Sequence, residues 1–476
     1  MHKSKRTWNV KKWAVGCVSI AVLLLVIAIV IWLGERMDPA ARAQLEAGDT
    51  LYQEGRFNKA EAAYLNALKL APENATVLEK LGLIALWRND TEEAESYFVD
   101  ALDHTPWYRN FWPLNINLKY RLGMTYLRQD RFADLAELFS EARGPVAIGP
   151  LRDLDAFGKQ MALFENETPY IVEGPNETRI DFVTTDPLPV IEVSVNGSEP
   201  VDFIIDTGGM EVILDDDLAE QVGAQIGGAL LGTYADQKKA ETGLGRVDSI
   251  TMGEFVVRNV PIHVLDTDPF SAGFGGLSIK GVISTRLLLH FLTTIDYRNG
   301  ALILQRTNSA NLQSLESQVA TAGVKAIPFW LIETHYIVAW GTVNNLDPML
   351  FFVDTGLEGA AFTASESVLQ EAGIPVDWTA AQEGVGGGGA FQEVDIVIDR
   401  LTLGTGGNEV VGNRLLGQAS EYPPSILGDK LGFYLGGLIS HQFFRDYALT
   451  LDFTGMRLIL QQYPIVHFSH PRRSTD

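Results

Sequence analysis

Two aspartates directly follow runs of apolar residues, where a carboxyl group is unusual. Asp206 follows the run in FIIDTGG, and Asp354 follows the run in FFVDTGL. Each is followed by threonine and glycine, and glycine lets the backbone turn sharply and leaves room for a close partner. If the two acids meet at contact distance, they cannot both ionise, so they share one proton. Such a pair can accept a proton with one carboxyl and donate a proton with the other.

The two D-T-G sequences belong to a longer internal repeat. LPVIEVSVNGSEPVDFIIDTGG predicts a strand, a turn at Asn196-Gly197 and a second strand that leads into the acid, and HYIVAWGTVNNLDPMLFFVDTG repeats this plan. Downstream, GVISTRLLLHFLTTIDYRNGALIL from Gly281 aligns without a gap with GLISHQFFRDYALTLDFTGMRLIL from Gly437. The chain therefore carries a duplicated β-rich unit of about 140 residues, the size of a small domain.

The paired elbows and their matched downstream segments resemble the active-site elbows of aspartic peptidases, the retropepsin and pepsin superfamily. The arrangement is most similar to two retropepsin-like bacterial units in tandem, with lobes at residues 165–308 and 321–465. The resemblance implies an all-β bilobal acid-protease-like fold of two similar halves, a peptide or protein substrate, and no need for a metal or a cofactor. It also implies a role for each elbow residue: Asp206 and Asp354 as the catalytic dyad, Thr207 and Thr355 interlocked by hydrogen bonds, and Gly208 and Gly356 at the turns.

The sequence departs from the family pattern beside the elbows. Ser284 and Ser440 stand where the family usually has glycine, and Gly209 and Leu357 stand where pepsins have serine or threonine. The resemblance also implies hairpin flaps, which exclude water and hold an extended peptide. The candidate flaps are LGTYADQKKAETGLGRV in the first half and EGVGGGGAFQEV in the second.

A helical repeat precedes the two lobes, and we predict it at residues 41–145. Gly48 and Gly82 are 34 residues apart, and so are Tyr64 and Phe98, a period that resembles the tetratricopeptide repeat. A third copy begins near Gly123 after a seven-residue insertion, and it has Leu135 where the others have alanine. Such arrays bind peptides or partner proteins, but a short array can equally be a spacer or a docking platform.

The N-terminus predicts a membrane anchor. Residues 13–33 are 21 residues without a charge, long enough to cross a bilayer, with tryptophans at both edges. The five basic residues within 1–12 predict a cytoplasmic tail, so the bulk of the chain is expected outside, in the periplasm if the host is Gram-negative. The formal net charge of −23 argues against nucleic acid as a partner. The single cysteine excludes an intrachain disulfide.

Other candidate residues have weaker patterns. His263, His290, His335 and His441 show no metal spacing and are interpreted as surface or packed side chains. Asp296 and Asp452 are expected to open strands and to satisfy turns.

The sequence thus predicts a membrane-anchored aspartic endopeptidase whose repeats bind a substrate or a partner protein. Two alternatives remain open at this point. One is a catalytically silent peptide-binding scaffold with the same fold, and the other is an enzyme in which each half pairs with a half of another chain.

Overall fold

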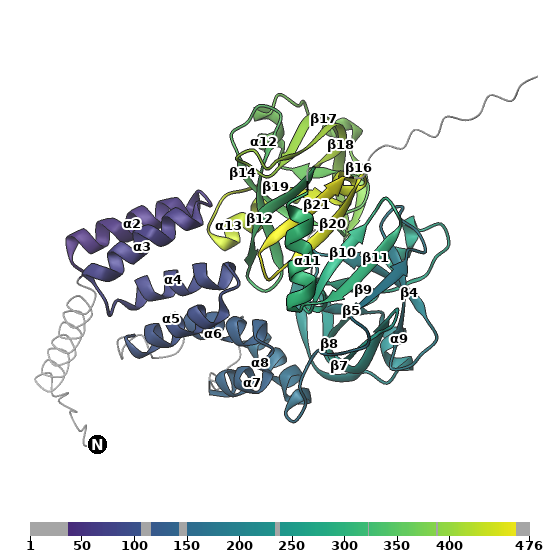
Figure 1. The fold of residues 1–476 in the computed structure, drawn as a ribbon, viewed down its shortest axis with the longest axis horizontal. Helices are drawn as coiled ribbons and strands as arrows, with labels where there is room; N and C mark the ends of the chain where they lie inside the picture. The colour runs from purple at the N-terminus through teal and green to yellow at the C-terminus, as the bar shows by residue number, and fades with distance from the viewer. Residues whose placement is uncertain are drawn as a thin grey trace, which may run out of the picture.

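The computed structural model describes residues 37–105, 116–141, 150–233, 239–321, 323–386 and 389–462. The predicted cytoplasmic tail 1–12 and the predicted transmembrane helix 13–33 lie outside these residues. Of the helices in the described ranges, none is long and apolar enough to span a membrane. A helical array lies beside a larger β-rich part (Figure 1).

Three antiparallel helix pairs and one further helix build the array. Its elements are α2 (Pro39–Gln53), α3 (Phe57–Leu70), α4 (Ala75–Trp87), α5 (Thr91–Asp103), α6 (Ile116–Arg128), α7 (Phe132–Glu141), α8 (Pro150–Met161) and the 3-10 turn η1 (Ala162–Phe164). Asn74 caps α4 by accepting from the Val77 N–H at 3.1 Å, and Asp90 caps α5 by accepting from the Glu93 N–H at 3.2 Å. These caps satisfy N–H groups that have no partner within their helices.

One glycine and one aromatic ring hold each helix pair together. A Cβ placed on Gly48 would lie 2.4 Å from the Tyr64 ring, and one on Gly82 would lie 2.7 Å from the Phe98 ring. Gly123 stands in the same relation to Phe139, at 2.5 Å. The third pair therefore packs like the first two, and the fully buried Leu135 fits against it.

The first lobe is an eight-stranded sheet in the order β1-β8-β5-β9-β4-β3-β7-β6. Its strands are β1 (Ile171–Glu173), β3 (Val190–Val195), β4 (Val201–Asp206), β5 (Val212–Leu214), β6 (Gln225–Thr233), β7 (Lys239–Met252), β8 (Phe255–Val264) and β9 (Ile279–Ser284). Three short helical elements accompany them: α9 (Asp216–Gln221), η2 (Asp268–Gly273) and α10 (Thr285–Leu288). The predicted turn joins β3 to β4, with Asn196 and Gly197 both at positive φ, 50° and 75°. This geometry favours the right-handed twist of a hairpin.

The second lobe repeats this plan and belongs to a 13-stranded sheet. Its own strands are β13 (Tyr336–Val343), β14 (Met349–Asp354), β15 (Phe362–Ala364), β16 (Gln382–Gly386), β17 (Gly389–Leu403), β18 (Val410–Ser420) and β19 (Leu435–Ser440). Its short helices are α12 (Glu366–Glu371), η3 (Trp378–Ala380), α13 (Ser425–Leu431) and α14 (His441–Phe444). In both lobes the strand that ends in the D-T-G acid pairs in parallel with the strand that ends in serine, β4 with β9 and β14 with β19.

Six further strands join the lobes, in the order β12-β21-β20-β10-β11-β2. They are β2 (Glu177–Asp181), β10 (Phe291–Asp296), β11 (Ala301–Arg306), β12 (Val324–Ile332), β20 (Tyr447–Asp452) and β21 (Arg457–Gln462). Strands β10 and β20, one from each half, pair directly with each other. Helix α11 (Ser309–Val319) links the halves, and its Leu315 packs against Leu292 and Ile459.

Asp296 and Asp452 correct one expectation, because they close strands β10 and β20 rather than opening them. Both do satisfy the turns that follow. Asp296 accepts from the Asn299 backbone N–H at 3.1 Å, and Asp452 accepts from the Gly455 N–H at 2.8 Å.

The array contacts the β-rich part through the turn inside each helix pair. Gly55, Asn89 and Asp130 occupy these turns, all at positive φ, which glycine, asparagine and aspartate tolerate best. Gly55 lies against Leu350, Asn89 donates to the Phe453 carbonyl, and Asp130 pairs with Arg286. An aromatic cluster reinforces this contact, with the Phe57 ring 5.1 Å from Trp330 and 5.3 Å from Phe433. The array is therefore docked on the β-rich part.

Candidate active site

Both D-T-G acids stand where a buried strand leaves the core. In β4, Phe203 and Ile205 are fully buried, and in β14 so are Phe351 and Val353. The aspartate that follows each run is a half-buried residue at the end of its strand. The apolar run thus fixes the direction of the strand, and the turn after it presents the acid at the strand end.

The two acids meet. Asp206 and Asp354 share a side-chain hydrogen bond. A Cβ on Gly208 would lie 2.6 Å from the carboxyl carbon of Asp354, and one on Gly356 would lie 2.3 Å from the carboxyl carbon of Asp206. Each glycine is therefore required by the acid of the opposite elbow, because any side chain there would collide with it.

The electrostatics separate the two carboxyl groups. Burial raises the pKa of Asp206 above its ordinary value, although backbone N–H groups of the elbows oppose this. Burial and the negative charge of Asp206 together raise the pKa of Asp354 well above its ordinary value. Asp354 therefore keeps its proton more readily than Asp206, so Asp354 is the donor and Asp206 the acceptor of their hydrogen bond.

The two elbow threonines lock the acids in place. The Thr207 N–H donates to Thr355 Oγ1 at 3.0 Å, and the Thr355 N–H donates to Thr207 Oγ1 at 3.0 Å. Each hydroxyl in turn donates to a carbonyl of the opposite strand, Thr207 to Val353 at 3.1 Å and Thr355 to Ile205 at 3.2 Å. Both side chains are fully buried, so these four bonds form away from water and are sensitive to the loss of a partner.

The two serines that depart from the family pattern fit the strands. Ser284 and Ser440 are fully buried, and they pair in register with Asp206 and Asp354. A Cβ at Gly209 would lie 2.4 Å from Ser284 Oγ, so this serine requires a glycine at that position. In the second half Ser440 Oγ instead donates to the carbonyl of Leu357, the residue equivalent to Gly209. The side chain of Leu357 is therefore accommodated.

Sequence reasoning did not place four side chains beside the dyad: it singled out neither of two tyrosines, and it named two histidines only as surface or packed residues. Tyr297 and Tyr336 lie close enough for the charge of Asp354 to raise their pKa values in addition to the larger effect of burial. The His335 ring hydrogen-bonds to the Gly208 backbone, and His441 Nδ1 lies 2.9 Å from the Leu357 carbonyl. No spacing relates the tyrosines or His335 to the elbows, but His441 directly follows Ser440.

The four histidines that the sequence analysis named are packed and neutral. Burial lowers the pKa of His263 and of His441 to about 4, and that of His290 and of His335 to about 3. His335 therefore contributes a hydrogen bond to the elbow at Gly208 rather than a positive charge.

The candidate flap segments form hairpins in both halves. In the first half β6 pairs with β7, from Gln225 opposite Arg246 to Thr233 opposite Lys239. In the second half β16 pairs with β17, from Gln382 opposite Glu393 to Gly386 opposite Gly389. Their tips, residues 234–238 and 387–388, lie outside the described residues.

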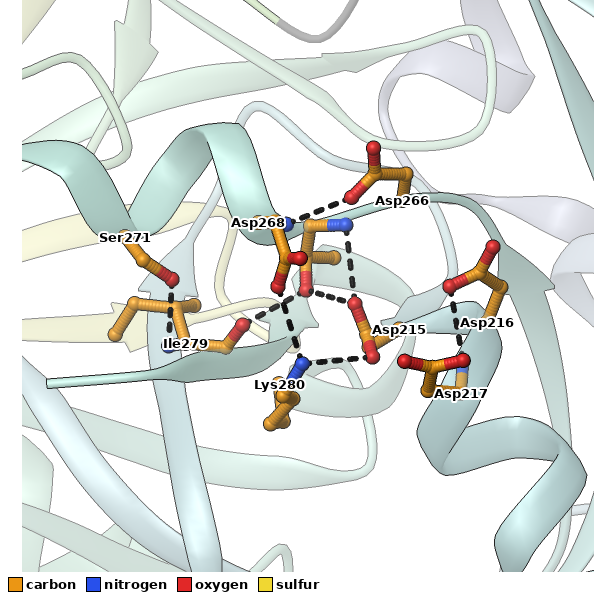
Figure 2. Close-up of polar contacts among 9 residues, drawn as sticks. Asp215, Asp216, Asp217, Asp266, Asp268, Ser271, Ile279 and Lys280 are labelled. Carbon is orange, nitrogen blue, oxygen red and sulfur yellow. Dashed lines mark hydrogen bonds and ion pairs between the residues drawn. The ribbon is translucent and has the colours of Figure 1, made fainter.

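An acidic cluster in the first lobe has a structural role. Asp215, Asp266 and Asp268 lie near one another beside η2 (Figure 2). Lys280 Nζ donates to Asp215 at 2.9 Å and to Asp268 at 3.2 Å, and Thr267 Oγ1 donates to Asp215 at 2.9 Å. The Lys280 ammonium group thus supplies a positive charge to two of the three acids, Asp215 and Asp268.

Two segments of the chain match known families. Residues 191–286 match the model of the aspartyl protease family, and residues 45–108 match the tetratricopeptide repeat. The first match runs from β3 to α10 and contains Asp206, whereas Asp354 lies outside it. No curated protein matches the chain. One segment of the chain is thus similar to an aspartyl protease domain, and an earlier segment is similar to tetratricopeptide repeats.

Proposed function

We propose that the protein is an aspartic endopeptidase that hydrolyses peptide bonds with a water molecule activated between Asp206 and Asp354. The observation that carries this proposal is the hydrogen bond between the two carboxyl groups at facing D-T-G elbows. The different pKa values support a division of labour, because one carboxylate acts as the base and one carboxylic acid acts as the acid.

In this mechanism the ionised Asp206 accepts a proton from the water, and the water oxygen attacks the peptide carbonyl carbon. Asp354 gives its proton to the carbonyl oxygen, which yields a neutral tetrahedral intermediate. The proton on Asp206 then passes to the leaving nitrogen, and the hydroxyl proton returns to Asp354 as the carbonyl reforms. The threonine lock holds both carboxyls in the geometry that each step needs.

We also propose that residues 13–33 anchor the enzyme as a single membrane span, with residues 1–12 in the cytoplasm and the catalytic part outside, in the periplasm of a Gram-negative host. The uncharged 21-residue run and the basic flank support this arrangement. The repeats would bind a protein substrate or a partner protein. Because they dock through their turns, their helix faces are the surfaces proposed for this binding.

The test measures cleavage of an unfolded protein by the full-length chain in detergent. Asp206→Asn and Asp354→Asn should each abolish cleavage, and the wild type should bind a pepstatin-like inhibitor. Asp202→Asn, on the same strand β4 as Asp206, is the matched control and should retain activity. Full activity of both dyad variants would contradict the proposal, and an inactive wild type that still binds peptides would favour the silent scaffold.

Gel filtration with an assay at several dilutions tests whether one chain suffices. Both elbows of the described dyad come from one chain, which supports a monomeric site. Specific activity should therefore stay constant on dilution. A fall in specific activity together with loss of a dimer would instead support sites formed between chains.

A further inference from the structure

The two halves match strand by strand, but they differ in charge near the dyad. Glu358 is the fourth residue after Asp354, and the equivalent residue after Asp206 is Met210. Gln418 of the second half and His263 of the first half occupy equivalent positions in the sheets. Gln418 pairs with Thr363, and His263 pairs with the equivalent residue Ile213. On the flap strands, Glu393 of β17 is equivalent to Thr242 of β7. The second half thus has two acids and an amide at these positions. The first half has Met210, Thr242 and His263, none of which carries a negative charge, and burial keeps His263 neutral.

The three second-half side chains gather beside the flap hairpin. Gln418 Nε2 donates to Glu393 Oε1 at 2.7 Å, and it lies 3.4 Å from the position of a Cβ on Gly359, next to Glu358. Glu393 Oε2 lies over the backbone of β16, 2.9 Å from the position of a Cβ on Gly384. The site is therefore built from the elbow, the flap hairpin and strand β18.

Glu358 also reaches the first lobe. One of its carboxylate oxygens lies 3.1 Å from the position of a Cβ on Gly273 of η2, with Pro187 of the first lobe close by. Strand β16 contacts the same turn. This acid therefore lies where the two lobes approach each other, on the second-half side of the dyad.

Among the residues that the structure describes, these groups have no positive partner. Within the ranges that the structure describes, no lysine, arginine or histidine lies at ion-pair distance from Glu358 or Glu393. Gln418 is 4% exposed, and its Oε1 atom is buried with no hydrogen-bond partner among the described residues. Burial, and then the charges of Asp395 and Glu358, raise the pKa of Glu393 to about 7. Carboxylates that are close together and partly buried are stabilised by a cation.

We propose that Glu358, Glu393 and Gln418 form a subsite for a lysine or arginine side chain of the peptide substrate, on one side of the scissile bond. A long cationic side chain can lay its methylene groups along the hairpin and place its charged end between the two carboxylates. The equivalent described residues of the first half, Met210, Thr242 and His263, offer no carboxylate, so the preference applies to one side only. This inference rests on the proposed peptidase function.

The test compares matched peptides that contain a lysine, an arginine or a glutamine at each position around one cleavage site. The full-length wild type should cleave the basic peptide at one position with a kcat/KM about ten to a hundred times that of the glutamine peptide, the range for a charge-assisted hydrogen bond. Glu358→Gln combined with Glu393→Gln should remove this preference and should leave cleavage of the glutamine peptide. Glu383→Gln, an exposed acid on the same hairpin, should keep the preference.

Binding measurements separate this inference from the peptidase proposal. Fluorescence anisotropy with the Asp206→Asn variant should show tighter binding of the basic peptide, and the double glutamine substitution should remove the difference. If no peptide is cleaved, the peptidase proposal fails, and the anisotropy still decides whether the subsite exists. Equal affinity for basic and neutral peptides, or a preference that survives the double substitution, would overturn the subsite.

Discussion

Thr294 and Thr450 lie directly opposite each other in the ladder between β10 and β20, and their hydroxyl oxygens are 2.7 Å apart. They are equivalent residues of the two halves. Their separation of 156 positions is the same as that between Gly281 and Gly437, which begin the two aligned segments. Equivalent residues meet only on a pseudo-twofold axis. Thr207 and Thr355 meet in the same way at the elbows, so the axis runs from the shared sheet to the dyad.

The elbow lock predicts a clear difference between two substitutions at Thr207. Thr207→Val removes the acceptor of the Thr355 N–H and the donor to the Val353 carbonyl, which leaves buried polar groups without partners. We expect a loss of about 2 to 4 kcal/mol in the free energy of unfolding and a large loss of cleavage. Thr207→Ser keeps the hydroxyl and should retain most of both. Urea unfolding and a cleavage assay provide the comparison, and equal behaviour of the two variants would argue against the lock.

The elbow glycines predict a steric effect on the opposite acid. In Gly356→Ala the new methyl group would stand 2.3 Å from the carboxyl carbon of Asp206, so the acid must move away from Asp354. We expect cleavage to fall by about a hundredfold or more, because a displacement of about 1 Å is enough for such a loss. Leu357→Ala, one residue further on, removes atoms and should keep the dyad intact. Wild-type activity in Gly356→Ala would show that the close approach is unimportant.

The raised pKa values predict a bell-shaped dependence of kcat on pH. Activity should fall at low pH as Asp206 gains a proton and at high pH as Asp354 loses its proton. The high-pH limb should lie well above the ordinary pKa of an aspartate. A rate that is independent of pH through the acidic and neutral range would contradict the shared proton.

The same shift predicts that Asp354→Asn is more stable than the wild type at neutral pH. Because the folded pKa of Asp354 is raised, its contribution to stability is fully present below the unfolded pKa and is lost as pH rises through the folded pKa. Asparagine does not titrate, so the variant avoids this loss. We expect a melting temperature higher by about 2 to 4 °C at pH 7, the shift that 1 kcal/mol gives in a domain of this kind, and no gain near pH 3. A lower melting temperature at both pH values would oppose this interpretation.

A buried charge network between the repeats and the first lobe predicts strong coupling of the two parts. Arg286 is 1% exposed and pairs with Asp130 of the array at 2.9 Å and with Glu211 at 3.4 Å. Arg286→Met leaves both acids without their cation, and we expect a loss of about 3 to 5 kcal/mol. Arg179→Met breaks an exposed pair with Asp181 and should cost at most about 1 kcal/mol. Urea unfolding followed by tryptophan fluorescence measures both, and equal costs would mean that the network does not join the parts.

The sequence by itself determined the local elements and the repeat that relates them. Apolar alternation, the Asn196-Gly197 turn and the glycine–aromatic spacing of the helix pairs depend on neighbours in the chain, so strands, hairpins and helix pairs could be predicted from them. The duplication also indicated which residues are equivalent, and therefore that Asp206 belongs with Asp354. These patterns are local or repeat at fixed spacing, which makes them visible without coordinates.

Only the tertiary structure decided how these elements meet. The distance between the acids, the position of Arg286 against Asp130 and the grouping of Glu358 with Glu393 and Gln418 depend on contacts between residues far apart in the chain. The spacing of side chains along the sequence carries no information about such contacts, because they are set by strand order and by the packing of one lobe on another. The same reason explains why Tyr297 and His335 beside the dyad could not be found from a motif.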